Sequence, residues 1–152
     1  MSLKDRLTED MKEAMKAKEA GKLRLSVIRM VRAAVKNQEI DKGRELNDEE
    51  VTQVLTKEAK LRRESLLEFE KAGRAEAVET LKEEIEVLMG YLPRQLTEEE
   101  IIVIVKKALQ ETGAQTPQEM GNVMSKVMPE TKGRADGKLV NEIVKRALSG
   151  QL

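Results

Sequence analysis

Apolar residues recur every third or fourth position along almost the whole chain, and this spacing constrains the fold more than any other feature. In a helix such residues share one face, whereas a half-buried strand requires alternation. The clearest run is Val78, Leu81, Ile85, Leu88 and Leu92. Ile101–Val105 alone would suit a strand, but Thr97 and Glu98–Glu100 before it are typical of a helix start. The pattern predicts an all-α, multihelical protein.

Glycines, prolines and capping residues divide this pattern into four longer helices followed by a compact three-helix unit. The first helix is closed by Gly21, and the second is expected over about 22–41. Asn47 followed by Glu50 resembles a capping box that opens a third helix over 48–71. Pro93 should end the fourth helix, since proline disfavours helical geometry in the residue before it. We therefore expect two helical subdomains, residues 1–92 and 93–152.

In the second subdomain, Thr116-Pro117-Gln118-Glu119 predicts another helix start. Pro129 is expected to end that helix, and Gly121 within it to permit close packing against a neighbour. The last helix should begin near Asp136. Its stripe is Leu139, Val140, Ile143, Val144, Ala147 and Leu148.

The same periodicity predicts which side chains are buried. Leu3, Leu7, Met11 and Met15 share one face of the first helix. On the second helix the apolar face is Leu23, Val27, Ile28, Met30, Val31, Ala34 and Val35. Basic residues interleave with Glu58 and Glu64 on the third helix, which is typical of a solvated face. These basic residues are Lys57, Lys60, Arg62 and Arg63.

Composition excludes several classes of site. Lys and Arg number 28, as do Asp and Glu, which argues against a generally basic nucleic-acid binder. The chain has no Cys and no His, so it lacks thiolate chemistry and the side chain most used for acid–base catalysis near neutral pH. The sequence predicts no catalytic residues, metal site or cofactor. No signal peptide is recognisable and the longest apolar run is too short for a bilayer, so a cytoplasmic protein without a membrane partner is expected.

The segment 131–138 is the least ordinary part of the chain. Two glycines permit close backbone approach, and the segment opens into a helix N-terminus whose amides could bind a phosphate. The predicted nucleic-acid-binding residues are Lys132, Gly133, Arg134, Gly137, Lys138, Lys145 and Arg146. The alternative is an ordinary turn with Asp136 as N-cap. A nucleotide-hydrolysis loop is excluded, because the two glycines are one residue too close and Leu139 replaces the required Ser or Thr.

A second basic row, Arg29, Arg32 and Lys36, lies opposite the apolar face of the second predicted helix. It would suit contact with a nucleic-acid backbone, although such rows are more often solvated helix faces. The sequence leaves both readings open.

Four segments resemble the GatB/YqeY family, in order along nearly the whole chain. They are Leu25-Ser26-Val27-Ile28-Arg29-Met30, Tyr91-Leu92-Pro93-Arg94-Gln95-Leu96, Met120-Gly121-Asn122-Val123-Met124 and Gly133-Arg134-Ala135-Asp136-Gly137-Lys138-Leu139-Val140. The combination of the four segments in this order is specific. It indicates a free-standing YqeY-like protein, similar to the C-terminal tail of the GatB component of glutamine-dependent tRNA amidotransferases.

That resemblance implies a two-part helical fold and a non-catalytic module that binds tRNA or assists a tRNA enzyme. The expected partners are tRNA, through its backbone phosphates, and a tRNA-modifying or aminoacylation enzyme. One alternative is a protein-interaction adaptor that uses Met120, Met124 and Met128. Another is an amidotransferase-related enzyme, a carbon–nitrogen ligase with glutamine as amido-N-donor.

Overall fold

The computed structural model describes residues 1–152 and contains seven α-helices and no strand, which confirms the all-α prediction. The chain divides into two compact units, an N-terminal unit of Met1–Leu92 and a C-terminal unit of Pro93–Leu152. Each unit has its own apolar core. None of the helices is long and apolar enough to cross a membrane.

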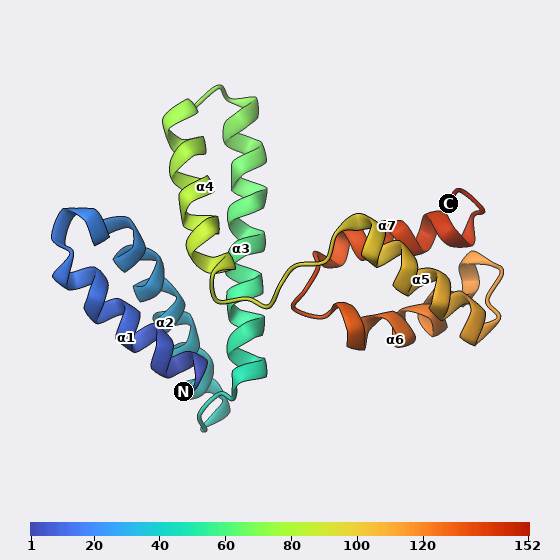
Figure 1. The fold of residues 1–152 in the computed structure, drawn as a ribbon, viewed down its shortest axis with the longest axis horizontal. Helices are drawn as coiled ribbons and strands as arrows, with labels where there is room; N and C mark the ends of the chain where they lie inside the picture. The colour runs from blue at the N-terminus through green and yellow to red at the C-terminus, as the bar shows by residue number, and fades with distance from the viewer. The chain divides into compact units, whose positions relative to one another are not determined.

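The N-terminal unit consists of α1 (Leu3–Lys16), a 3₁₀ turn over Lys18–Gly21, α2 (Lys22–Lys42), α3 (Asp48–Lys71) and α4 (Ala75–Met89). α1 packs along α2, and α3 forms a hairpin with α4 (Figure 1). The helix lengths follow from local signals. Asn47 and Glu50 form the predicted capping box, in which Asn47 Oδ1 accepts a hydrogen bond from the Glu50 amide at 2.9 Å.

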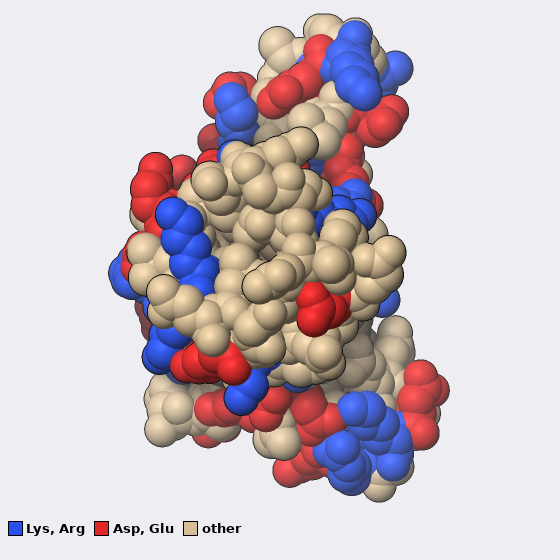
Figure 2. Space-filling model, turned by 90° about the vertical axis from the view of Figure 1, so that its right-hand side faces the viewer, with Lys and Arg blue, Asp and Glu red and all other residues tan.

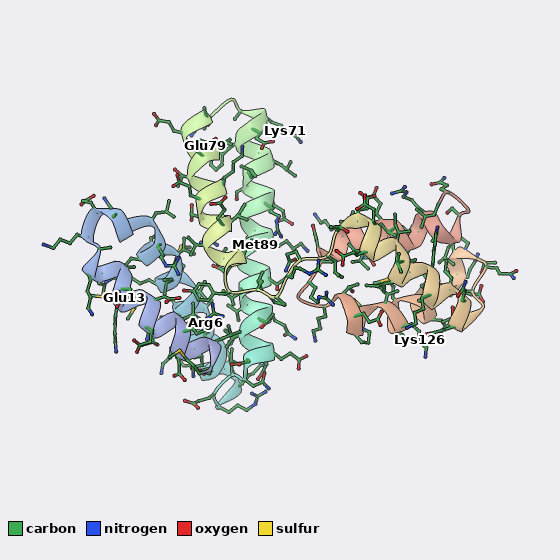
Figure 3. The ribbon with its side chains drawn as sticks, in the orientation of Figure 1. Arg6, Glu13, Lys71, Glu79, Met89 and Lys126 are labelled. Carbon is green, nitrogen blue, oxygen red and sulfur yellow. The ribbon has the colours of Figure 1, made fainter.

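The core of the N-terminal unit is aliphatic apart from one ring, that of Tyr91. It consists of Leu7, Val27, Ile28, Val31, Val35, Leu46, Val51, Val54, Leu55, Ala59, Leu88 and Tyr91. The distal half of α3 adds no buried apolar side chain, and Lys71 and Glu79 lie near the end of the hairpin (Figure 3). Core packing therefore concentrates where α1, α2 and the first half of α3 meet.

Three burial predictions for this unit are wrong. Met15 and Met30 are each 50% exposed, and Ala14 replaces Met15 in the interior because Gly21 packs directly against its backbone. Arg62, expected on a solvated face, is buried. Its guanidinium bonds Glu84 on α4, a partner that the periodicity of α3 does not reveal.

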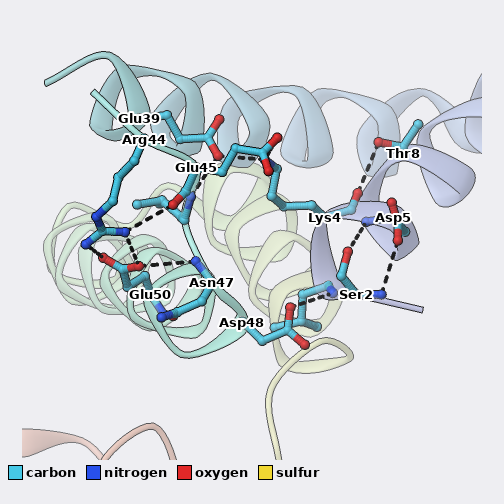
Figure 4. Close-up of polar contacts among 12 residues, drawn as sticks. Ser2, Lys4, Asp5, Thr8, Glu39, Arg44, Glu45, Asn47, Asp48 and Glu50 are labelled. Atoms are coloured by element: carbon cyan, nitrogen blue, oxygen red, sulfur yellow. Dashed lines mark hydrogen bonds and ion pairs between the residues drawn. The ribbon is translucent and has the colours of Figure 1, made fainter. Parts of the chain in front are cut away.

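Polar contacts tie the start of α1 to the start of α3 (Figure 4). Ser2 and Asp5 form a capping box on α1, and Asp48 Oδ1 accepts a hydrogen bond from the Leu3 amide at 3.1 Å. Glu50 accepts hydrogen bonds from Arg44 and Lys42, which lowers its pKa strongly. Asp48, 45 residues away in the sequence, thus satisfies a free amide at the start of α1.

The C-terminal unit is a three-helix bundle of α5 (Glu98–Thr112), α6 (Met120–Thr131) and α7 (Gly137–Leu148), with a 3₁₀ turn over Pro117–Glu119 (Figure 1). Thr97 caps α5 as predicted. Its core consists of Ile101, Val105, Ala108, Val123, Val127, Val140, Ile143, Val144 and Leu148.

Two predictions about α6 are wrong. The helix continues to Thr131, two residues beyond Pro129, because a proline in the last turn removes only its own amide donor. The Lys132 amide still donates to the Met128 carbonyl at 2.9 Å. Gly121 does not pack against a neighbour, since no atom outside its own stretch of helix backbone lies within 4 Å of the place where a Cβ would stand.

Candidate functional site

The turn between α6 and α7 begins with a left-handed residue. Gly133 has a φ of 76°, a conformation that glycine adopts without steric cost. The Arg134 amide donates to the Thr131 carbonyl at 2.9 Å, which closes the turn. The turn is therefore ordered by its own backbone.

This turn is also held against the segment that precedes α5. The Gln95 side-chain amide donates to the Gly133 carbonyl at 3.1 Å, and the Leu96 amide donates to the Arg134 carbonyl at 2.8 Å. Two of the four segments that carry the family resemblance thus meet. Both of these carbonyls already accept hydrogen bonds from within the protein. A ligand would therefore contact side chains of the turn or the free amides at the start of α7.

The N-terminus of α7 already holds an anion from the chain itself. Asp136 Oδ1 accepts a hydrogen bond from the Lys138 amide at 3.0 Å, as the alternative reading of this turn predicted. The carboxylate complements the helix dipole in the place that a phosphate would otherwise occupy. Gly137 is exposed as the first residue of α7.

The predicted basic residues do not form one cluster. Lys132, Lys138 and Lys145 are exposed, and Lys138 and Lys145 share a face of α7 with Glu142 between them. Arg146 lies elsewhere on the helix, where its Nη1 is 3.3 Å from Glu98 Oε1 on α5. The exposed lysines are thus the members best placed to meet a large anion.

Arg134 is half-buried and lines a shallow groove of about 370 Å³ with Glu100, Val103 and Glu130. Two carboxylates in this groove make it less favourable for phosphate than the lysine face of α7. Figure 2 looks onto the end of the C-terminal unit at which α5 and α7 end, and mostly uncharged atoms lie there. The segment 113–118 at that end has no charged residue. A polyanion would therefore bind elsewhere on the unit.

A basic groove between α1 and α2 was not predicted from the sequence. Arg29, Arg32 and Lys36 line this groove together with Lys4 from α1. The helical spacing of the first three residues was visible in the sequence. The participation of Lys4 depends on the packing of α1 against α2, which no local pattern indicates.

A family model described as Yqey-like protein matches residues 4–148. The chain belongs to this family. Membership of the Yqey-like family confirms the YqeY part of the resemblance drawn from the four segments. The matched residues include those that line the α1–α2 groove and those of the α6–α7 turn.

This Yqey-like chain is also similar to fungal proteins named "Altered inheritance of mitochondria protein 41, mitochondrial". It is 32% identical to the protein of Pyrenophora tritici-repentis over 151 residues, which cover 96% of this chain and 81% of that protein. It is 34% identical to the protein of Kluyveromyces lactis over 133 residues, which cover 81% of this chain and 70% of that protein. The mitochondrial designation belongs to those proteins.

Proposed function

We propose that this Yqey-like protein is a non-catalytic module that binds tRNA or assists a tRNA enzyme, like the tail domain of glutamine-dependent aminoacyl-tRNA amidotransferases. The observation that carries the proposal is the exposed lysine set Lys132, Lys138 and Lys145 on and beyond an ordered turn. An ordered turn limits the conformational entropy lost when its side chains engage a ligand.

Contact would be made with the phosphate backbone and the shape of a folded RNA. The chain has only two aromatic side chains, and Tyr91 is buried in the N-terminal core. Stacking on unpaired bases, which single-strand binders use, would therefore contribute little. Lysine ammonium groups contact phosphate as point charges and do not discriminate between nucleotide sequences.

A salt titration with purified tRNA tests the proposal. Phosphate contacts by these three lysines would give a slope of log affinity against log salt of roughly −2 to −3. The triple variant Lys132→Gln, Lys138→Gln, Lys145→Gln should bind more weakly and with a shallower slope. A matched control, Lys106→Gln, Lys107→Gln, Lys126→Gln, removes three exposed charges from the same unit. Absence of binding by the unmodified protein at low salt would refute the proposal, and equal loss in both variants would refute the site.

The second candidate is a protein-interaction adaptor, and the exposure of α6 methionines favours it. Met128 is 43% exposed, and Met120 and Met124 are only partly buried. A flexible thioether suits an adaptable apolar contact. Affinity purification after nuclease treatment separates the two candidates, because a protein partner would be retained without RNA and lost from a Met128→Glu variant.

The amidotransferase-related enzyme and the cytoplasmic location stay predictions. Glutamine-dependent turnover by the isolated chain would support the enzyme. Fluorescence microscopy of the tagged protein in its own cells would establish the location.

A further inference from the structure

The groove between α1 and α2 has a volume of about 520 Å³ and is lined mainly by polar side chains. Four are basic and two acidic: Lys4, Arg29, Arg32, Lys36, Glu39 and Glu45. Buried Leu7 and Val35 also contribute to the lining, so its apolar part is fixed by the core. The groove is therefore a preformed cationic depression.

The two carboxylates are already engaged at one end of the groove. Lys4 Nζ lies 2.6 Å from Glu39 Oε2 and 3.6 Å from Glu45 Oε1 (Figure 4). Glu39 also accepts a hydrogen bond from the Leu46 amide at 2.9 Å. The hydrogen bond from Lys4, followed by that from Leu46, lowers the pKa of Glu39. Lys4 therefore compensates much of the acidic charge in the groove.

The other three cations form no salt bridge with a carboxylate, although Lys36 acts electrostatically on Glu39. Arg29 and Lys36 make no ion pair, and the hydrogen bond of Arg32 goes to the Met11 sulfur, a weak acceptor, at 2.9 Å. All three side chains are exposed. Their donors can therefore engage a ligand without breaking an internal ion pair.

Their spacing suits a row of anions. Positions 29, 32 and 36 fall on one face of α2, and seven residues of helix span roughly 10 Å. Guanidinium groups bind phosphate oxygens in a bidentate fork, and lysine adds a mobile point charge. A single phosphate could not reach both ends of such a row, whereas linked phosphates could.

We propose that the α1–α2 groove binds two or three linked phosphate groups, either as a free oligophosphate or as part of an RNA backbone. Arg29 and Arg32 clamp phosphate oxygens, and Lys36 neutralises the next phosphate along the groove. The site lies in the N-terminal unit and does not require the α6–α7 turn. It is therefore independent of the tRNA surface proposed above.

Isothermal titration calorimetry with inorganic tripolyphosphate at low salt tests the groove. The variant Arg29→Gln, Arg32→Gln, Lys36→Gln should bind at least about tenfold more weakly, since charged hydrogen bonds are lost. The control Lys12→Gln, Lys16→Gln, Lys82→Gln also removes three charges from exposed sites of the N-terminal unit and should bind within about twofold of the unmodified protein. Amide NMR shifts of Thr8 and Ala33 on adding tripolyphosphate locate the site without any substitution.

Failure of the unmodified protein to bind tripolyphosphate would overturn the proposal, as would equal loss in the two variants. The source of the phosphates is decided by measuring tRNA affinity of the groove variant. Weaker tRNA binding supports an RNA backbone, and unchanged tRNA binding with lost tripolyphosphate binding supports a free oligophosphate. If the protein binds no tRNA at all, the tripolyphosphate result still stands, so the two proposals can fail separately.

Discussion

Nε of Arg62 on α3 lies 3.2 Å from Oε1 of Glu84 on α4, and only 8% of the Arg62 side chain is exposed. The same guanidinium donates to the Glu58 carboxylate at 3.3 Å and to the Met30 sulfur of α2 at 3.3 Å. One buried cation therefore joins three helices. It satisfies two carboxylates beside a largely aliphatic core.

Replacing Arg62 with Met should destabilise the protein by about 2–4 kcal/mol, because Glu58 and Glu84 are left partly buried without their cation. Urea denaturation measures the change. Lys60→Met, on an exposed position of the same helix, should cost less than about 0.5 kcal/mol. Adding Glu84→Gln to Arg62→Met should recover part of the loss, and full additivity of the two changes would contradict this coupling.

Replacing two of the glycines with alanine should change the stability of the protein in opposite directions. A Cβ at Gly21 would stand 2.2 Å from the carbonyl oxygen of Ala14, so Gly21→Ala should destabilise by about 1–3 kcal/mol. Gly121 has open space around it within α6, so Gly121→Ala should stabilise by about 0.5–1 kcal/mol. Thermal and urea unfolding of each variant give the sign of the change in the free energy of unfolding. The same sign for both variants would contradict the structure.

The Glu100 carboxylate should titrate well below its ordinary range. The Arg94 guanidinium donates to it at 2.9 and 2.8 Å, and with the Thr97 amide this lowers its pKa from 4.5 to about 2. The pKa of Glu100 is thus lower in the folded state than in the unfolded state. The stabilisation that this ionised carboxylate contributes is therefore fully present above pH 4.5 and is lost as the pH falls towards 2. Carbon-detected NMR titration measures the pKa. Arg94→Gln should raise it towards 4.5, and an unchanged value would show that Arg94 is not the main cause.

Asp136→Asn tests the anion preference of the α7 N-terminus. Asparagine keeps the cap, so the fold should be retained, but the negative charge beside the Lys138 amide is removed. If Lys132, Lys138 and Lys145 contact tRNA, the affinity for tRNA at low salt should rise roughly two- to fivefold. Glu111→Gln, an exposed change elsewhere in the unit, is the control, and an equal rise there would indicate a general charge effect.

Local sequence patterns predicted the helices and their caps well. The capping boxes at Asn47, Thr97 and Thr116 join residues three positions apart, so the sequence contains both partners of each hydrogen bond. The proline at 129 was misleading for a related reason. Proline removes only one backbone amide donor from the helix. The neighbouring backbone hydrogen bonds maintain the helix for another two residues.

An all-α protein of seven helices could be predicted from local sequence, because hydrophobic periodicity and helix caps act within a few residues. The burial of Arg62 depends on tertiary packing, since its partner Glu84 is 22 residues away. Packing of α1 on α2 likewise placed Lys4 beside Glu39, 35 residues away, and left Arg29 and Lys36 without ion pairs. Whether a charged side chain is buried or paired depends on which helix faces pack together. The hydrophobic periodicity of one helix does not indicate which helix packs against it.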